Sequence, residues 1–135
     1  MDKLIEYLKN EIWFRVGQSN IHGVGLIAIR DIPKGTDILV EFKHLFGKKK
    51  FSIKKKKMLD IHPNIKKLWN DYWYNDSVYQ EIYLPPNYKQ LHVFYINHSN
   101  NPTGDLICHD NHAKFVTIKD VKEGEEIFTD YKRTI

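Results

Sequence analysis

Residues 92–103 read HVFYINHSNNPT, and this stretch decides how the whole chain is interpreted. An apolar run ends at Ile96 and is followed at once by an amide, an imidazole and a hydroxyl, from Asn97, His98 and Ser99. Polar groups at the edge of a core need hydrogen-bond partners. Taken singly, Asn97 and Ser99 are ordinary turn formers, and His98 is a core histidine bonded to a backbone carbonyl. Whether the stretch has a further purpose depends on the rest of the sequence.

The bulk properties predict a globular chain. Its 135 residues suit one domain with one core, and 41% hydrophobic residues argue against disorder. No apolar run approaches the roughly 20 residues of a membrane span, so no membrane partner is expected. Residues 1–12 mix acids with apolar residues, unlike a signal peptide. The single cysteine, Cys108, excludes an internal disulfide and a cysteine-based zinc cluster. We expect an intracellular protein, in the cytoplasm or, if the source is viral, in the host nucleus.

The net charge of +4 comes from one segment, Lys48–Lys57, which reads KKKFSIKKKK. Without its seven lysines, 14 basic residues face 17 acidic ones, so the remainder is mildly acidic. Such a segment fits an acidic protein partner or a partner associated with nucleic acid. A solvated loop with no partner explains it equally well, because no arginine-rich or regularly aromatic pattern accompanies it.

Periodicity predicts a mainly β protein with short helices. The opening and closing parts contain strand-length apolar pieces joined by tight turns, without the long helices of a βαβ protein. We divide the single domain, 1–135, into amino-terminal strands at 12–42, a variable and irregular insert at 43–90, and a carboxyl-terminal region at 91–131. Within these parts we expect helices at 2–11 and near Ile65, and strands at 12–16, 23–29 and 38–42 and in the pieces from residue 89 onward.

Two further stretches carry chemistry. Residues 19–35 read SNIHGVGLIAIRDIPKG, in which Gly23 and Gly25 allow another group to approach the backbone closely. A dinucleotide site is improbable there, because the third glycine and the helix are missing; a tight turn between two strands is the simpler interpretation. Residues 122–131 read KEGEEIFTDY and end at Tyr131, which by itself suits a packed aromatic residue with a surface hydroxyl.

In this order, GVGLIAIRDIPKG, INHSNNP and GEEIFTDY resemble the SET-domain protein lysine methyltransferases. The resemblance covers residues 12–131 in outline, with the middle unmatched. It implies a β-clip fold of small curled sheets in which the carboxyl-terminal segment threads under the Asn97–Ser99 loop as a pseudoknot, a rare exception to unthreaded chains.

The resemblance also implies an activity, the transfer of a methyl group from S-adenosyl-L-methionine to the ε-amine of a lysine in a protein or peptide. Its cofactor-binding residues would be His22, Gly23, Val24, Gly25, Asn97, His98 and Tyr131. No metal is required. The loop at His22–Val24 would meet the methionine portion through backbone atoms, the Asn97 side chain would hold the methionine end, and the backbone of His98 would meet the adenine.

Tyr131 matches the family's catalytic position. Its hydroxyl would orient the substrate amine and stabilise charge near the methyl group. Only on the order of one lysine in 10³ is uncharged at neutral pH, so an aromatic channel and the sulfonium charge are needed to lower the pKa of the substrate amine.

Three departures from the family pattern stand out. Many members have an aromatic residue two positions before the final tyrosine, where this chain has Thr129, so the number of methyl groups added stays open. The usual Asn after Asn-Pro is Thr103, a mild substitution. The chain also stops four residues after Tyr131 without the cysteine-rich zinc segment that completes the lysine channel in many members. Either the aromatic insert around Tyr72, Trp73 and Tyr74 or a second copy of the chain, as a homodimer, must then close the channel.

Other functions remain open at this point. A nucleic-acid-binding module using Lys48–Lys57 would leave the Asn-His-Ser and Gly-Glu-Glu elements unexplained. A metal hydrolase built from His98, Cys108, His109 and His112 lacks the spacing of a known zinc motif. The last alternative is a SET-like domain that binds protein without catalysis.

Overall fold

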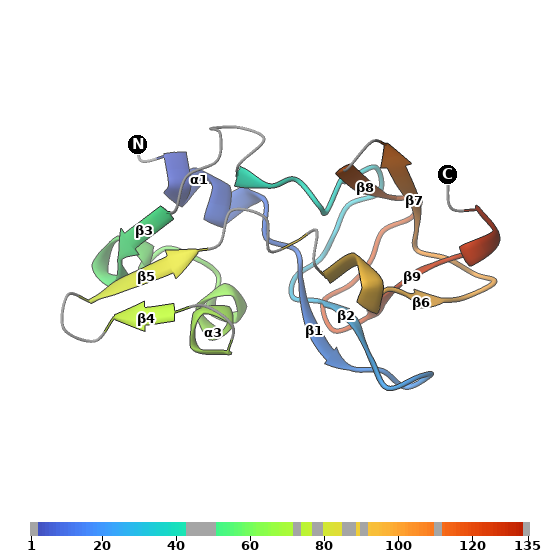
Figure 1. Cartoon of the computed structure of the whole chain (residues 1–135), viewed down its shortest axis with the longest axis horizontal. Coiled ribbons are helices and arrows are strands. Elements are labelled where there is room, and N and C mark those ends of the chain that lie inside the picture. Colours follow the sequence, from blue (N-terminus) through green and yellow to red (C-terminus); the bar gives the residue numbers. More distant parts are fainter. Residues whose placement is uncertain are drawn as a thin grey trace. The chain divides into compact units, whose positions relative to one another are not determined.

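The computed structural model of the chain describes residues 3–42, 51–71, 74–76, 80–84, 89, 92–109 and 112–133. These residues fall into two compact units, which we describe separately (Figure 1). The motif unit comprises residues 13–40 and 89–135 and carries all three stretches singled out above. The flanking unit comprises residues 1–12 and 41–88.

The motif unit contains a sheet with the strand order β1-β2-β9-β6. Strands β1 (Phe14–Gln18) and β2 (Val24–Ala28) form an antiparallel hairpin. The late strand β9 (Glu126–Thr129) pairs antiparallel with β2. On its other side β9 pairs in parallel with the short strand β6 (Asn97–His98), so the expected meeting of the carboxyl-terminal segment with the Asn97–Ser99 stretch is present as a strand pair.

A second sheet of the motif unit is the antiparallel hairpin of β7 (Gly104–His109) and β8 (His112–Thr117). Short 3-10 helices precede β6 and follow β9, namely η2 (His92–Tyr95) and η3 (Tyr131–Arg133). Apolar side chains from these strands and the turns between them form one buried core, made of Phe14, Leu26, Ala28, Ile32, Ile38, Leu39, Ile96, Ala113, Phe115, Val121 and Ile127.

Strand β9 has two different faces because successive side chains point to opposite sides of a strand. Ile127 and Thr129 are buried, at 0% and 1% exposure. Glu126 and Phe128 lie on the opposite face and are half-buried. The alternation therefore brings one carboxylate, that of Glu126, to the outer face of a strand whose inner face is packed in the core.

The flanking unit contains α1 (Lys3–Asn10), η1 (Lys55–Met58) and α3 (Pro63–Asp71), together with β3 (Phe51–Lys54), β4 (Tyr74–Asp76) and β5 (Glu81–Leu84). Its sheet is antiparallel throughout, with the order β3-β5-β4. Helix α1 buries Leu4, Ile5 and Leu8, the spacing that puts apolar side chains on one helical face. Within the part of the chain that the structure describes, no helix has the length and apolar character needed to cross a bilayer.

Most expected elements of the motif unit are confirmed, with shifted ends, but two predictions for that unit and one for the insert are wrong. The expected strand at 38–42 is absent: residues 38 and 39 form a turn, and their neighbour Asp37 makes an isolated bridge to Val116. The piece leading to Asn97 is the helix η2 rather than a strand. The insert at 43–90 is not irregular in its described parts, because it supplies the whole β3-β5-β4 sheet. Burial of Ile38 and Leu39 in the core explains the first error, since their apolar run reads equally as strand or as packed turn.

Candidate functional site

The loop between β1 and β2, residues 19–23, is closed by Ser19. The Ser19 backbone N–H donates to the Gly23 carbonyl at 2.9 Å. The Ser19 hydroxyl oxygen accepts hydrogen bonds from the backbone N–H groups of Ile21 (3.0 Å) and His22 (3.1 Å). One buried hydroxyl thus fixes the main chain of the loop that contains His22, in the manner of the side-chain turns that serine favours.

The side chain of Asn97 meets this loop from β6. Its Nδ2 donates to the carbonyl oxygen of Val24 at 3.0 Å and lies 3.3 Å from the carbonyl oxygen of His22. It also donates to Oε2 of Glu126 at 2.8 Å. Asn97, 8% exposed, therefore ties β2, β6 and β9 together at one point. Among the described residues none donates to its carboxamide oxygen.

Gly23 in the β1–β2 loop and Gly25 in β2 are required for different reasons. Gly25 lies against the Asn97 and Glu126 side chains: a Cβ there would come 3.0 Å from Asn97 Nδ2 and 2.8 Å from Glu126 Cδ, and would clash with the carboxylate itself. Gly23 has a φ of +52° and open space where a Cβ would be. Gly25 thus leaves room for the Asn97 and Glu126 side chains to pack against the backbone. Gly23 instead adopts the positive φ that the turn needs, and the space beside its Cα is unoccupied.

His98 and Tyr131 form the other end of the site. The Tyr131 backbone N–H donates to His98 Nδ1 at 3.0 Å, so the imidazole proton is on Nε2, 3.1 Å from Asn100 Oδ1. The two rings lie 5.2 Å apart at 51°. The Tyr131 hydroxyl donates to the Ile96 carbonyl at 2.8 Å, which fixes the ring beside β6 although the residue is 58% exposed. The His98 ring is therefore satisfied by a backbone N–H, not by the carbonyl considered from sequence.

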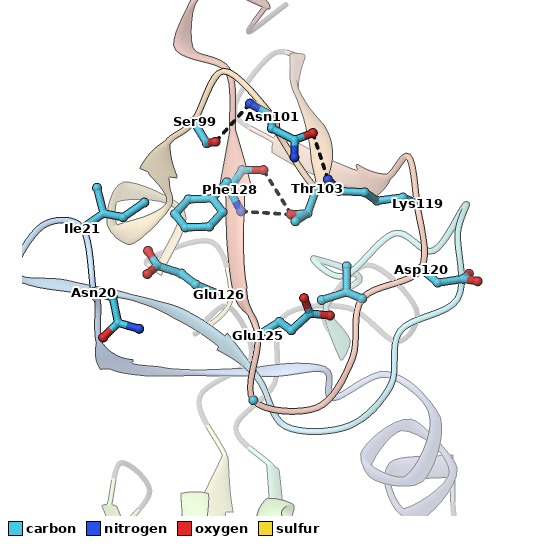
Figure 2. Close-up of a pocket in the computed structure, with 12 residues that line it drawn as sticks. Asn20, Ile21, Ser99, Asn101, Thr103, Lys119, Asp120, Glu125, Glu126 and Phe128 are labelled. Carbon is cyan, nitrogen blue, oxygen red and sulfur yellow. Dashed lines mark hydrogen bonds between the residues drawn. The ribbon is translucent and has the colours of Figure 1, made fainter.

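The loop after β6 returns to β9. The Ser99 backbone N–H donates to the Thr129 carbonyl, and that of Thr103 to the Phe128 carbonyl, each at 3.0 Å. The Thr103 hydroxyl both donates to the Phe128 carbonyl (3.1 Å) and accepts from the Phe128 N–H (2.9 Å), as Figure 2 shows. Residues 97–103 thus hold β9 by backbone and side-chain bonds together.

A cavity of about 500 Å³ lies on the outer face of β9 (Figure 2). Glu126 and Phe128 contribute from the strand, Asn20 and Ile21 from the β1–β2 loop, and Ser99 from the loop after β6. The cavity borders the same three segments that the motif stretches supply, but none of the seven residues expected from sequence lines it. All seven residues expected from sequence lie in the motif unit, and His22, Val24, Asn97, His98 and Tyr131 are joined directly or through Ile96 and Glu126.

Two residues of this network, Ser19 and Glu126, are not among the residues expected from sequence. Ser19 connects the β1–β2 loop to β9 because its hydroxyl donates to Glu126 Oε1 at 2.6 Å. A signal for each exists: Ser19 precedes a glycine turn, where side-chain turns form, and Glu126 is a charged residue next to core positions of a strand.

Thr129, at the position where many family members have an aromatic residue, points into the core. Its hydroxyl is buried and has no hydrogen-bond partner among the described residues. A small residue therefore occupies this position, and it contributes no ring to the site.

The competing sites considered from sequence are less well formed. Across the described ranges no group of three His, Cys, Asp or Glu side chains is placed to hold a metal ion. His98 lies in β6, whereas Cys108, His109 and His112 lie in the β7–β8 hairpin, where Cys108 is exposed.

Two other segments considered from sequence are described only in part. The residues outside the described ranges are Lys48, Lys49 and Lys50 of the basic segment and Tyr72 and Trp73 of the aromatic insert. Of the basic segment, Lys54, Lys55 and Lys56 line a hollow of about 400 Å³ in the flanking unit.

A family model described as the SET domain matches residues 23–132. That range includes Gly23 to Gly25, Asn97, His98, Glu126 and Tyr131, while His22 and Ser19 lie just before it. A comparison with curated proteins finds no match.

Solved structures similar to the chain include a Plasmodium falciparum protein described as a candidate histone methyltransferase. Sequence identity is 21%, the alignment covers 89% of this chain and 93% of that one, and the TM-score is 0.47. Another is a humanized mutant of the Chaetomium thermophilum Polycomb Repressive Complex 2 bound to the inhibitor GSK126. It has 21% identity, coverage of 89% of this chain and 15% of that one, and a TM-score of 0.43.

Proposed function

Because the chain belongs to the SET domain family, we propose that it is an S-adenosyl-L-methionine-dependent methyltransferase acting on the ε-amine of a lysine in a protein substrate. One observation carries the proposal: the three motif stretches, far apart in sequence, meet at Asn97. Its side chain bonds the Val24 carbonyl at the start of β2 and the Glu126 carboxylate of β9, and the ring of its neighbour His98 bonds the Tyr131 backbone.

The residues present fit the proposed cofactor. A methionine moiety carries an ammonium group, and the carboxamide oxygen of Asn97, to which no described residue donates, would be a suitable acceptor for it. The adjoining loop is accessible, since Ile21 is 62% and Val24 46% exposed and Gly23 faces open space. When bound, the cofactor would supply the methyl group as a sulfonium substituent.

Tyr131 would position the substrate amine. Its hydroxyl proton is directed to the Ile96 carbonyl, so the phenolic oxygen presents lone pairs outward. An incoming uncharged amine can donate one N–H to this oxygen, which aligns the nitrogen lone pair with the bond to be formed. Ile96 immediately precedes Asn97. One short segment would therefore hold the methyl donor through Asn97 and fix, through the Ile96 carbonyl, the tyrosine that would orient the substrate amine. Holding the reacting groups in this alignment before the reaction would lower the activation free energy of a displacement by several kcal/mol.

Lysine selection would follow from the same exposed ring. The ring of Tyr131 is the aromatic surface that the motif unit offers beside His98. A desolvating surface next to a positive sulfonium disfavours the ammonium form, because burial and a like charge both lower the pKa of a lysine amine.

The test is a methylation assay on an array of lysine-containing peptides, read by mass spectrometry, with isotope-labelled S-adenosylmethionine as donor. We expect label on lysine in a subset of peptides, with none when S-adenosylhomocysteine replaces the donor. A folded chain that labels no peptide and no protein extract would refute the enzymatic function and favour the non-catalytic alternative.

A further inference from the structure

The carboxylate of Glu126 joins two parts of the proposed cofactor site, and the proposed function gives it no role. Its Oε1 accepts from the Ser19 hydroxyl at 2.6 Å, and its Oε2 accepts from Asn97 Nδ2 at 2.8 Å. Figure 2 shows the side chain leaving β9 with the carboxylate directed toward the loop that carries Asn20 and Ile21. A single side chain thus links the β1–β2 loop to β6.

The hydrogen-bond directions leave no freedom at this link. The Ser19 oxygen accepts the Ile21 and His22 N–H groups, so its own hydrogen is directed to Glu126. Asn97 Nδ2 has two hydrogens, and its two shortest bonds go to Glu126 and to the Val24 carbonyl. The carboxamide oxygen of Asn97 must then point away from both.

Both partners donate, so the group between them has to accept on each of its two oxygens. A carboxylate does this, and a carboxamide does not, because one of its two polar atoms is an NH₂ donor. In Glu126→Gln the new NH₂ group would face another hydrogen-bond donor, either the Ser19 hydroxyl or the Asn97 NH₂ group. Relief at Asn97 requires its carboxamide to turn over, which breaks the bonds to Val24 and His22.

We propose that Glu126 is a positioning residue that orients the Asn97 carboxamide and the β1–β2 loop for binding of S-adenosylmethionine. This inference rests on the proposed function and adds a residue that acts through Ser19 and Asn97. Charge-assisted hydrogen bonds are the strong ones, so their loss is expected to show in the affinity.

The experiment compares Glu126→Gln with Glu123→Gln, a matched loss of charge at an exposed residue three positions earlier. Calorimetric titration with S-adenosylmethionine is expected to show about tenfold weaker binding for Glu126→Gln, corresponding to one lost charged hydrogen bond, and no change for Glu123→Gln. At saturating donor the turnover should stay within about threefold of wild type, since Tyr131 is untouched.

A second readout needs no ligand. Amide hydrogen exchange of the Ile21 and His22 N–H groups should accelerate in Glu126→Gln, because the Ser19 oxygen that accepts them loses the carboxylate that orients it. If Glu126→Gln does not fold, Ser19→Ala removes the same link from its other end and is tested by calorimetric titration, in which binding of S-adenosylmethionine should again be about tenfold weaker.

The outcomes separate the two claims. Unchanged affinity and unchanged loop exchange in Glu126→Gln would overturn the positioning role even if wild type methylates lysine. Wild type that binds no S-adenosylmethionine would instead refute the proposed function and, with it, the cofactor part of this inference. Weaker binding with turnover preserved and faster loop exchange would support it.

Discussion

The motif unit and the flanking unit are assembled in different ways. In the motif unit the central strand pairs join segments from opposite ends of the chain, as where Leu26 pairs with Ile127. In the flanking unit the pairs join nearby segments, as where Phe51 pairs with Leu84. The motif unit collects side chains that no local segment could bring together, and its polar contacts are shared among three elements. Substitutions there should disturb several elements at once, whereas those in the flanking unit should stay local.

The largest expected effect is on turnover and comes from Tyr131→Phe. Removing the hydroxyl keeps the aromatic ring beside His98 but takes away both its bond to the Ile96 carbonyl and the oxygen that would orient the amine. Methyl transfer should fall about 10²-fold or more, near 2.7 kcal/mol in the activation free energy. Steady-state assays measure the rate, while calorimetry should find the S-adenosylmethionine affinity within about threefold of wild type. Equal turnover by both proteins would remove Tyr131 from the mechanism.

Gly25→Ala should be the most disruptive change in the β1–β2 hairpin. The added methyl group displaces the Glu126 carboxylate and with it the bonds to Ser19 and Asn97. We expect a loss of about 2 kcal/mol in the free energy of unfolding by denaturant titration, the cost of a disrupted charged hydrogen bond. Gly23→Ala is the control. Its methyl group would enter open space, so the expected loss in the free energy of unfolding comes only from the positive φ and is about 1 kcal/mol. Equal losses of stability in the two variants would show that the close packing of Glu126 and Asn97 against Gly25 does not matter for stability.

Two buried threonines test how fully the polar contacts around β9 are satisfied. The Thr129 hydroxyl has no partner among the described residues, whereas the Thr103 hydroxyl makes two bonds to Phe128. Thr129→Val should therefore raise the free energy of unfolding by about 1 kcal/mol, and Thr103→Val should lower it by about 1–2 kcal/mol. Thermal or chemical unfolding measures both. A loss of stability in Thr129→Val would mean that its hydroxyl has a partner.

The smallest effect is expected in the flanking unit. Lys54 and Glu81 face each other across β3 and β5 and form an ion pair of 3.1 Å with the Lys54 side chain 44% exposed. Exposed pairs contribute little, so Lys54→Met should change the free energy of unfolding by no more than about 0.5 kcal/mol. Chemical unfolding at low and high salt checks this. A loss above about 1.5 kcal/mol would contradict the view that this unit tolerates local change.

The sequence predicted the motif unit better than the flanking unit, for a physical reason. Strands such as β2 and β9 alternate or run apolar between turn residues, and the order of motifs around Gly23, Asn97 and Tyr131 identified the family. The residues from 43 to 90 offered no motif and mixed lysines with aromatic residues, so their sheet was missed. Strands of three or four residues are too short to show a clear hydrophobic periodicity in the sequence.

Part of the site could not be read from the sequence. The bonds of Glu126 to Ser19 and Asn97 depend on the register of β9 with β2 and β6, which periodicity does not supply. The two glycines looked alike in sequence, and only the packing around Gly25 separates their purposes. A turn residue can be predicted from local preference, but a close contact between distant segments needs the fold.

Nuclear magnetic resonance titration of the isotope-labelled chain with S-adenosylmethionine tests the central claim most directly. If the three motif segments form one cofactor site, the backbone signals of residues 22–25, 97–98 and 131 should shift together with a single dissociation constant. Residues of the flanking unit such as Ser52 and Ile53 should respond less. Shifts confined to one segment, or dissociation constants that differ among the three, would show that the segments meet in the fold without sharing a ligand.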